Sequence, residues 1–191
     1  MGKTFRVVTL LAVLSCAAAA AQAQYPQRRD GFWIGFGLGY GSANVSCDNC
    51  ASGARTGGPT VFLKLGGTPS RNLLIGASLN VWAHPTDSLT ESMGNITASL
   101  FYYPMTKSGL FLSGGLGFSA YNLDSSPEVN GSGWGFTAGV GYDVRVGRNV
   151  SLTPVVNYTY GALGDFDVPG IGTARGWKQN VIDVGLGVTF H

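Results

Sequence analysis

Apolar and polar residues alternate in the last segment of the chain. Residues 183–190 read Asp-Val-Gly-Leu-Gly-Val-Thr-Phe, and only His191 follows them. Successive side chains of a strand point to opposite faces, so the residues at even numbers share one face and those at odd numbers the other. The pattern predicts a β-strand with one face of large apolar side chains and one face of small or polar side chains.

The same alternation recurs in seven earlier segments and predicts an eight-stranded antiparallel sheet. The expected strands cover residues 32–40, 61–66, 72–82, 95–103, 110–119, 134–145 and 151–160, and the last strand begins near Trp177. Short turns are expected after the second, fourth and sixth strands, and longer loops at 41–56, 84–90, 122–132 and 162–176. Pro154 falls within the seventh strand, where it removes a backbone hydrogen-bond donor.

The first 23 residues have a different pattern. Lys3 and Arg6 precede an apolar run, which ends in Ala-Gln-Ala at residues 21–23. These features predict a cleaved signal peptide at residues 1–23. A transmembrane anchor and a lipoprotein leader with Cys16 as the lipidated residue are alternatives. Residues 24–30 are expected to form a polar lead-in, and residues 31–191 a single barrel domain.

Composition decides which face of the sheet meets solvent. Only 12% of the residues are charged, whereas 30 are glycines. A soluble barrel would need charges on its outer face, but the polar face carries mainly Gly, Ser, Thr and Asn. Eight strands enclose an interior just wide enough for side chains, so the small residues fit inside and the apolar ones outside. The sequence predicts an all-β, eight-stranded, up-and-down transmembrane β-barrel. No basic patch indicates nucleic-acid binding.

The last strand resembles the C-terminal assembly signal of bacterial outer-membrane β-barrels. Asp183, Gly185, Val188 and Phe190 carry the resemblance, although in that family the aromatic is usually the last residue. As a whole, residues 31–190 resemble the small OmpA/OmpX-type barrels. The resemblance implies the outer membrane of a Gram-negative bacterium, with lipid and lipopolysaccharide around the barrel. It also implies the barrel-assembly machinery and periplasmic chaperones as partners, and a monomer.

Two sets of residues are candidate sites. Lys64, Asp143, Arg145 and Asp183 fall on the inner face, where they predict either an ion path or, as the better account, a salt-bridged cluster that fills the lumen. Cys47 and Cys50 lie in the first long loop, and an exported protein favours a disulfide between them. The cysteine spacing lacks the further ligands of a zinc site.

Catalytic and metal-binding alternatives are weaker. His84, Asp87, Ser88 and Glu91 contain the residue types of a lipid-ester hydrolase, as in the outer-membrane lipid A deacylases, but their spacing differs from that family. Asp165 and Asp167 lack the further oxygen ligands of a calcium loop. We therefore expect no catalytic residue, cofactor or metal. As the resemblance to outer-membrane barrels implies, the expected function is a structural surface protein that supports envelope integrity, with extracellular loops that serve adhesion or interaction and a surface ligand unknown. A lipid-modifying enzyme and a small-solute pore are the alternatives.

Overall fold

The computed structural model describes residues 26–49, 53–86, 89–124, 129–168 and 172–191. The strands are β1 (Gly31–Ser46), β2 (Thr56–Ser70), β3 (Leu73–Pro85), β4 (Thr90–Tyr102), β5 (Leu110–Asp124), β6 (Val129–Tyr142), β7 (Val144–Arg145), β8 (Val150–Val168) and β9 (Gly172–Phe190). Within these ranges no helix is long and apolar enough to cross a membrane. The predicted signal peptide, residues 1–23, lies outside the described residues.

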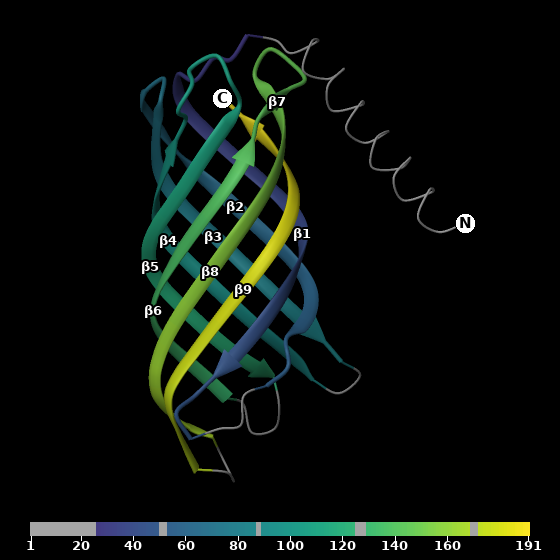
Figure 1. Cartoon of the computed structure of the whole chain (residues 1–191), viewed down its shortest axis with the longest axis vertical. Coiled ribbons are helices and arrows are strands. Elements are labelled where there is room, and N and C mark those ends of the chain that lie inside the picture. The colour runs from purple at the N-terminus through teal and green to yellow at the C-terminus, as the bar shows by residue number, and fades with distance from the viewer. Residues whose placement is uncertain (1–25, 50–52, 87–88, 125–128, 169–171) are drawn as a thin grey trace, which may run out of the picture.

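The strands form one closed antiparallel barrel. Consecutive strands pair from β1 to β6, β8 pairs with β9, and β9 returns to β1 with Ile34 opposite Phe190. The pairing of β6 with β8 completes the ring, which Figure 1 shows as a cylinder of tilted strands. The predicted eight-stranded up-and-down barrel is therefore confirmed.

The nine labels describe eight barrel strands, because β6 and β7 are one strand interrupted at Asp143. Gly141 pairs with Val155 before the break, and Val144 pairs with Leu152 after it. The register is unchanged, so Pro154, which has no N–H group, faces the interrupted stretch. On the other side of the strand, the Asp143 amide donates to the carbonyl oxygen of Gly109, just before β5, at 2.9 Å. The break thus lies where the sequence lacks a donor.

The strand ends differ from those expected. Most of the expected loop at 162–176 is strand, because β8 continues to Val168 and β9 begins at Gly172. Each of these strands has 19 residues, whereas a bilayer needs only about 9–11. The backbone hydrogen-bond ladder therefore continues beyond the lipid, where side chains need not alternate. The predicted contrast between short turns and long loops was wrong in this respect.

The two faces of the barrel agree with the predicted alternation. The outer face is apolar, with exposed side chains that include Phe36, Leu38, Val61, Ile75, Leu100, Leu116, Phe118, Trp134, Val156, Val184 and Leu186. Small residues do line the lumen, but they do not fill it alone. One inner cluster consists of Trp33, Phe62, Leu74, Phe101, Tyr103, Phe111 and Val155, and a second contains Trp82, Met93, Tyr121, Leu163 and Val181.

Glycines make room for these large inner side chains. A Cβ atom at Gly187 would lie 2.8 Å from the ring of Phe62, and one at Gly185 would lie 2.9 Å from it. Both distances are too short for ordinary packing, so the bare backbone of β9 accommodates the ring from β2. The lumen is thus a packed core, built from aromatic side chains on some strands and glycines on others.

Candidate functional site

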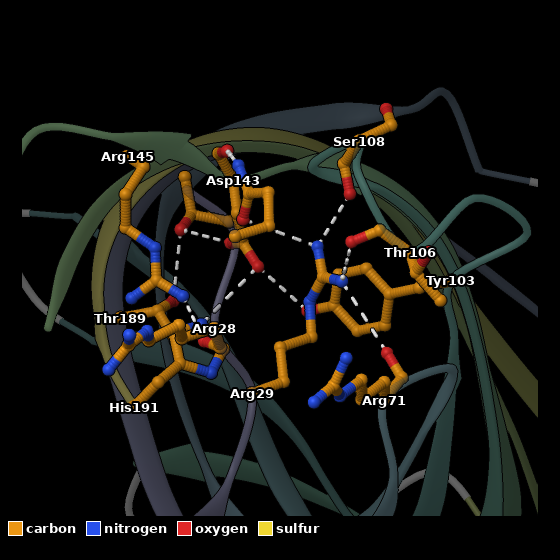
Figure 2. Close-up of polar contacts among 12 residues, drawn as sticks. Arg28, Arg29, Arg71, Tyr103, Thr106, Ser108, Asp143, Arg145, Thr189 and His191 are labelled. Atoms are coloured by element: carbon orange, nitrogen blue, oxygen red, sulfur yellow. Dashed lines mark hydrogen bonds and ion pairs between the residues drawn. The ribbon is translucent and has the colours of Figure 1, made fainter. Parts of the chain in front are cut away.

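The lead-in residues before β1 fold into the mouth of the barrel at the end where the C-terminus lies (Figure 1). Arg29 is only 2% exposed. Its guanidinium group lies 3.6 Å from the centroid of the Tyr103 ring, and Figure 2 shows the two side chains together. The N–H groups donate to the carbonyl oxygens of Ser108 at 2.6 Å and Thr106 at 3.3 Å. Arg29 thus connects the lead-in to the β4–β5 connection.

Further contacts hold the lead-in on other sides of the mouth. The side-chain amide of Gln27 donates to the carbonyl oxygen of Asp143 at 3.1 Å. A longer bond of 3.5 Å joins Arg29 to the carbonyl oxygen of Arg71, in the β2–β3 turn. Arg145 of β7 donates to the carbonyl oxygen of Arg28. The lead-in is therefore anchored to the β2–β3 turn, the β4–β5 connection and the interrupted β6–β7 strand.

Asp143 is the centre of a buried polar network beside the lead-in (Figure 2). The hydroxyl groups of Tyr103 and Thr153 each donate to its carboxylate at 2.7 Å. The His191 Nε2 atom lies 3.5 Å from the same carboxylate. Asp143 lies at the mouth, in the one-residue break between β6 and β7. Burial alone would raise its pKa, but His191 and the charge of Lys64 lower the pKa below its ordinary value of 3.8.

The four inner-face charges predicted from the sequence are all buried, but they do not form one salt-bridged cluster. Within the described ranges, the imidazole of His191 is the basic group within 4 Å of the Asp143 carboxylate, and no ion pair joins Lys64 or Arg145 to Asp143 or Asp183. Asp183 lies in another layer, where it accepts a hydrogen bond from Asn157 at 3.2 Å. The prediction of a salt-bridged cluster was therefore wrong: hydroxyl and amide groups, and one histidine, satisfy these carboxylates instead.

The residues that matter most at this mouth were not predicted. Arg29 precedes the alternating segments and so carried no signal in the periodicity. The alternation places Tyr103 only at the end of the expected strand 95–103 and indicates no contact for it. His191 was treated as an addition to the assembly signal, whereas its side chain is buried in the mouth beside Asp143. The available signal was the presence of Arg29 and His191 in a chain with few charged residues.

The proposed assembly signal lies at the closure of the barrel. Asp183 and Gly185 point inward, whereas Phe190 lies on the outer face and stacks on Phe36 of β1, with ring centroids 6.2 Å apart. Val188 lies on the same outer face, half-buried. These positions are consistent with an exposed strand edge before closure, but whether the assembly machinery reads them stays a prediction.

Of the other predicted sites, the described residues Cys47, His84 and Glu91 lie at the opposite end of the barrel. Cys50 is outside the described residues, so the Cys47–Cys50 disulfide stays a prediction. Asp87 and Ser88 of the hydrolase alternative are also outside them. His84 Nδ1 lies 2.9 Å from the carbonyl oxygen of Gly57, and Glu91 accepts a hydrogen bond from Tyr121 at 3.0 Å.

Comparison of the sequence with known protein families identifies the family of this chain. The family described as "Outer membrane protein beta-barrel domain" matches residues 9–190. The chain belongs to this family. Its members are proteins of the Gram-negative outer membrane, so the apolar outer face is the face that meets lipid. No curated protein was found to match the chain.

Among the solved structures that share the fold, two proteins are similar over most of this chain. Neisserial surface protein A is 19% identical, with a TM-score of 0.52; the match covers 84% of this chain and 97% of that one. The attachment invasion locus protein Ail of Yersinia pestis is 12% identical, also with a TM-score of 0.52, and the match covers 84% and 99%. At these identities the likeness concerns the architecture alone.

Proposed function

We propose that this outer-membrane barrel is a structural surface protein that supports envelope integrity, and that it neither conducts solutes nor catalyses a reaction. It acts as a monomer, with its strands surrounded by lipid and lipopolysaccharide. Periplasmic chaperones and the barrel-assembly machinery deliver it to the membrane. The hairpins beyond the lipid form its surface, where a ligand of unknown identity could bind.

The seal across the lumen is the observation that carries this proposal. Arg29, Tyr103 and Asp143 occupy the mouth, and the two inner aromatic clusters fill the barrel behind it. Three cavities inside the barrel that described residues line measure about 30, 10 and 40 Å³, and each has room for only a few waters. Side chains on opposite strands meet across the bore, which favours a rigid plugged barrel over an aqueous channel.

Conductance measurements test the absence of a pore. Purified, folded protein should produce no channel events in planar bilayers and no swelling of proteoliposomes in small sugars. A variant without residues 24–30 serves as the matched comparison, because it opens the mouth but leaves the inner clusters in place. Steady conductance by the parent protein would refute the proposal in favour of the pore.

A deletion strain tests the role in the envelope. Loss of the protein should increase sensitivity to detergent and to large antibiotics, and the parent gene should restore resistance. A variant with shortened surface hairpins should restore resistance equally if the barrel itself is what matters. Unchanged sensitivity of the deletion strain would contradict a contribution to envelope integrity.

A further inference from the structure

A cavity of about 30 Å³ lies inside the barrel, lined on one part by Phe62, Phe101 and Phe111 of the inner cluster and on the other by polar side chains. Its polar lining comes from Lys64, three serines, Thr137 and two asparagines, and no carboxylate lines it. Ser78, Ser99 and Ser113 belong to β3, β4 and β5, so the hydroxyl groups surround the space from several strands. The lining is therefore rich in groups that can donate hydrogen bonds.

Lys64 is a buried cation at this cavity without a close anionic partner. The residue is 6% exposed, and Gly35 leaves room for its stem, since a Cβ there would lie 2.7 Å from Lys64 Cε. The ammonium group lies 4.7 Å from the ring centroid of Phe111 and 5.5 Å from that of Phe101. Among the described residues, Lys64 makes no ion pair.

The remaining charges of the lumen do not offset Lys64 directly. Arg29, Lys64 and Arg145 are buried cations, whereas Asp143 and Asp183 are the buried carboxylates of the described chain. Asp143 attracts Lys64 but is already held by two hydroxyl groups and His191. Asp183 borders the neighbouring cavity and is held by Asn157. A buried charge without a close partner is costly, so this surplus favours a negative species beside Lys64.

One hydroxyl group at the cavity is also unsatisfied. Thr137 Oγ1 is buried and has no hydrogen-bond partner within the part of the chain that the structure describes. By contrast, the hydroxyl groups of Thr97 and Ser99 bond to each other at 2.9 Å. Thr137 comes from β6 and Lys64 from β2, and both line the same cavity. A free donor thus accompanies the buried ammonium group.

We propose that this cavity binds a small monovalent anion of the halide class, held by the Lys64 ammonium group and the surrounding hydroxyl groups. The cavity has room for about two waters or one such ion, which excludes organic anions and makes phosphate too large. A cation is excluded by Lys64 and by the lack of a lining carboxylate. The bound anion neutralises the charge that the aromatic rings of the inner cluster only partly stabilise.

Unfolding in two salts tests the site. Folded protein in detergent micelles is titrated with urea in sodium chloride and in sodium gluconate of equal ionic strength, and unfolding is followed by tryptophan fluorescence. Stability should rise with chloride and then approach the limit of simple ligand linkage. At a chloride concentration ten times Kd, the equilibrium constant for unfolding should be about 11-fold lower than in gluconate.

Two pairs of variants assign the effect to the cavity. Lys64→Met should abolish the response to chloride and, in gluconate, should be at least as stable as the parent protein, because a buried unpaired charge has been removed. Lys107→Met, in the exposed β4–β5 connection, should keep the full response. Thr137→Val should weaken the response several-fold, whereas Thr159→Val, which alters the neighbouring cavity, should not.

A bromide soak gives a direct readout. Crystals of the parent protein grown in bromide should show an anomalous difference peak beside Lys64, and crystals of Lys64→Met should not. The proposal is overturned if the parent protein is equally stable in both salts at every concentration, or if Lys64→Met and Thr137→Val both respond to chloride as the parent does. In either case the cavity holds only water.

Discussion

Replacing Arg29 by methionine should destabilise the barrel by about 2 kcal/mol. Methionine keeps an apolar stem against Tyr103 but removes the charge and the donors. The short bond to Ser108 is charge-assisted and contributes roughly 1.5–3 kcal/mol, and stacking of the guanidinium group on Tyr103 adds about 0.5–2 kcal/mol. The longer bonds to Thr106 and Arg71 contribute little.

Part of this loss is offset. Freeing Arg29 alone restores backbone freedom of about 1–2 kcal/mol, because the contacts through Gln27 and Arg28 still hold the rest of the lead-in. The carbonyl groups that Arg29 leaves behind lie at the mouth, where water can reach them. A net loss of about 2 kcal/mol remains, equivalent to a fall in Tm of roughly 4–8 °C for a chain of this size.

The assay is urea unfolding in detergent micelles, with Arg28→Met as the matched control. The Arg28 side chain is exposed, and its contact with Arg145 uses only the backbone carbonyl group. The control should therefore unfold at the same urea concentration as the parent protein. If Arg29→Met and Arg28→Met have the same midpoint, the lead-in does not stabilise the mouth and the reasoning is refuted.

Three other outcomes follow from the same structure. The free energy of unfolding of Asp143→Asn should be roughly 3 kcal/mol lower than that of the parent protein at pH 7. Because the pKa of Asp143 is lowered in the folded state, this difference should shrink as the pH falls below 3.8. A difference that does not change with pH would contradict the charge argument. Phe190→Ala should reduce the amount of protein in the outer membrane of cells more than it reduces refolding in detergent. Deletion of His191 should lower the stability of the barrel but leave assembly intact. Normal outer-membrane levels of Phe190→Ala would exclude Phe190 as part of the assembly signal. Exported protein should resist alkylation at Cys47 and Cys50 until it is reduced, and complete labelling without reductant would exclude the disulfide.

The two faces of the barrel could be predicted because they depend only on local periodicity. Leu186 and Gly187 take opposite sides by the geometry of a strand, whatever their neighbours are. The same reasoning correctly placed Lys64, Asp143, Arg145 and Asp183 inside. Closure was predictable too, since in lipid an open edge would leave backbone groups unsatisfied.

Partners across the lumen could not be predicted in this way. Whether Asp143 meets Lys64, His191 or Tyr103 depends on the stagger of strands that are distant in sequence, and alternation says nothing about stagger. The strand ends were missed for a related reason. Beyond the lipid, the outer face of β8 and β9 need not be apolar, and register shifts between Ala162 and Phe166 interrupt the alternation while the ladder continues.

The mouth network joins segments that are formed by different hairpins. Arg29 donates hydrogen bonds to carbonyl oxygens of the β2–β3 turn and the β4–β5 connection. Asp143 lies at the β6–β7 break, and His191, beside it, follows β9. These groups converge only when the barrel is closed, because β1 and β9 must pair before His191 and the lead-in reach the same mouth. The contacts therefore stabilise the closed state rather than any single hairpin. The same residues occupy the bore, so the stability of the barrel and the impermeability that we propose for it have one structural cause.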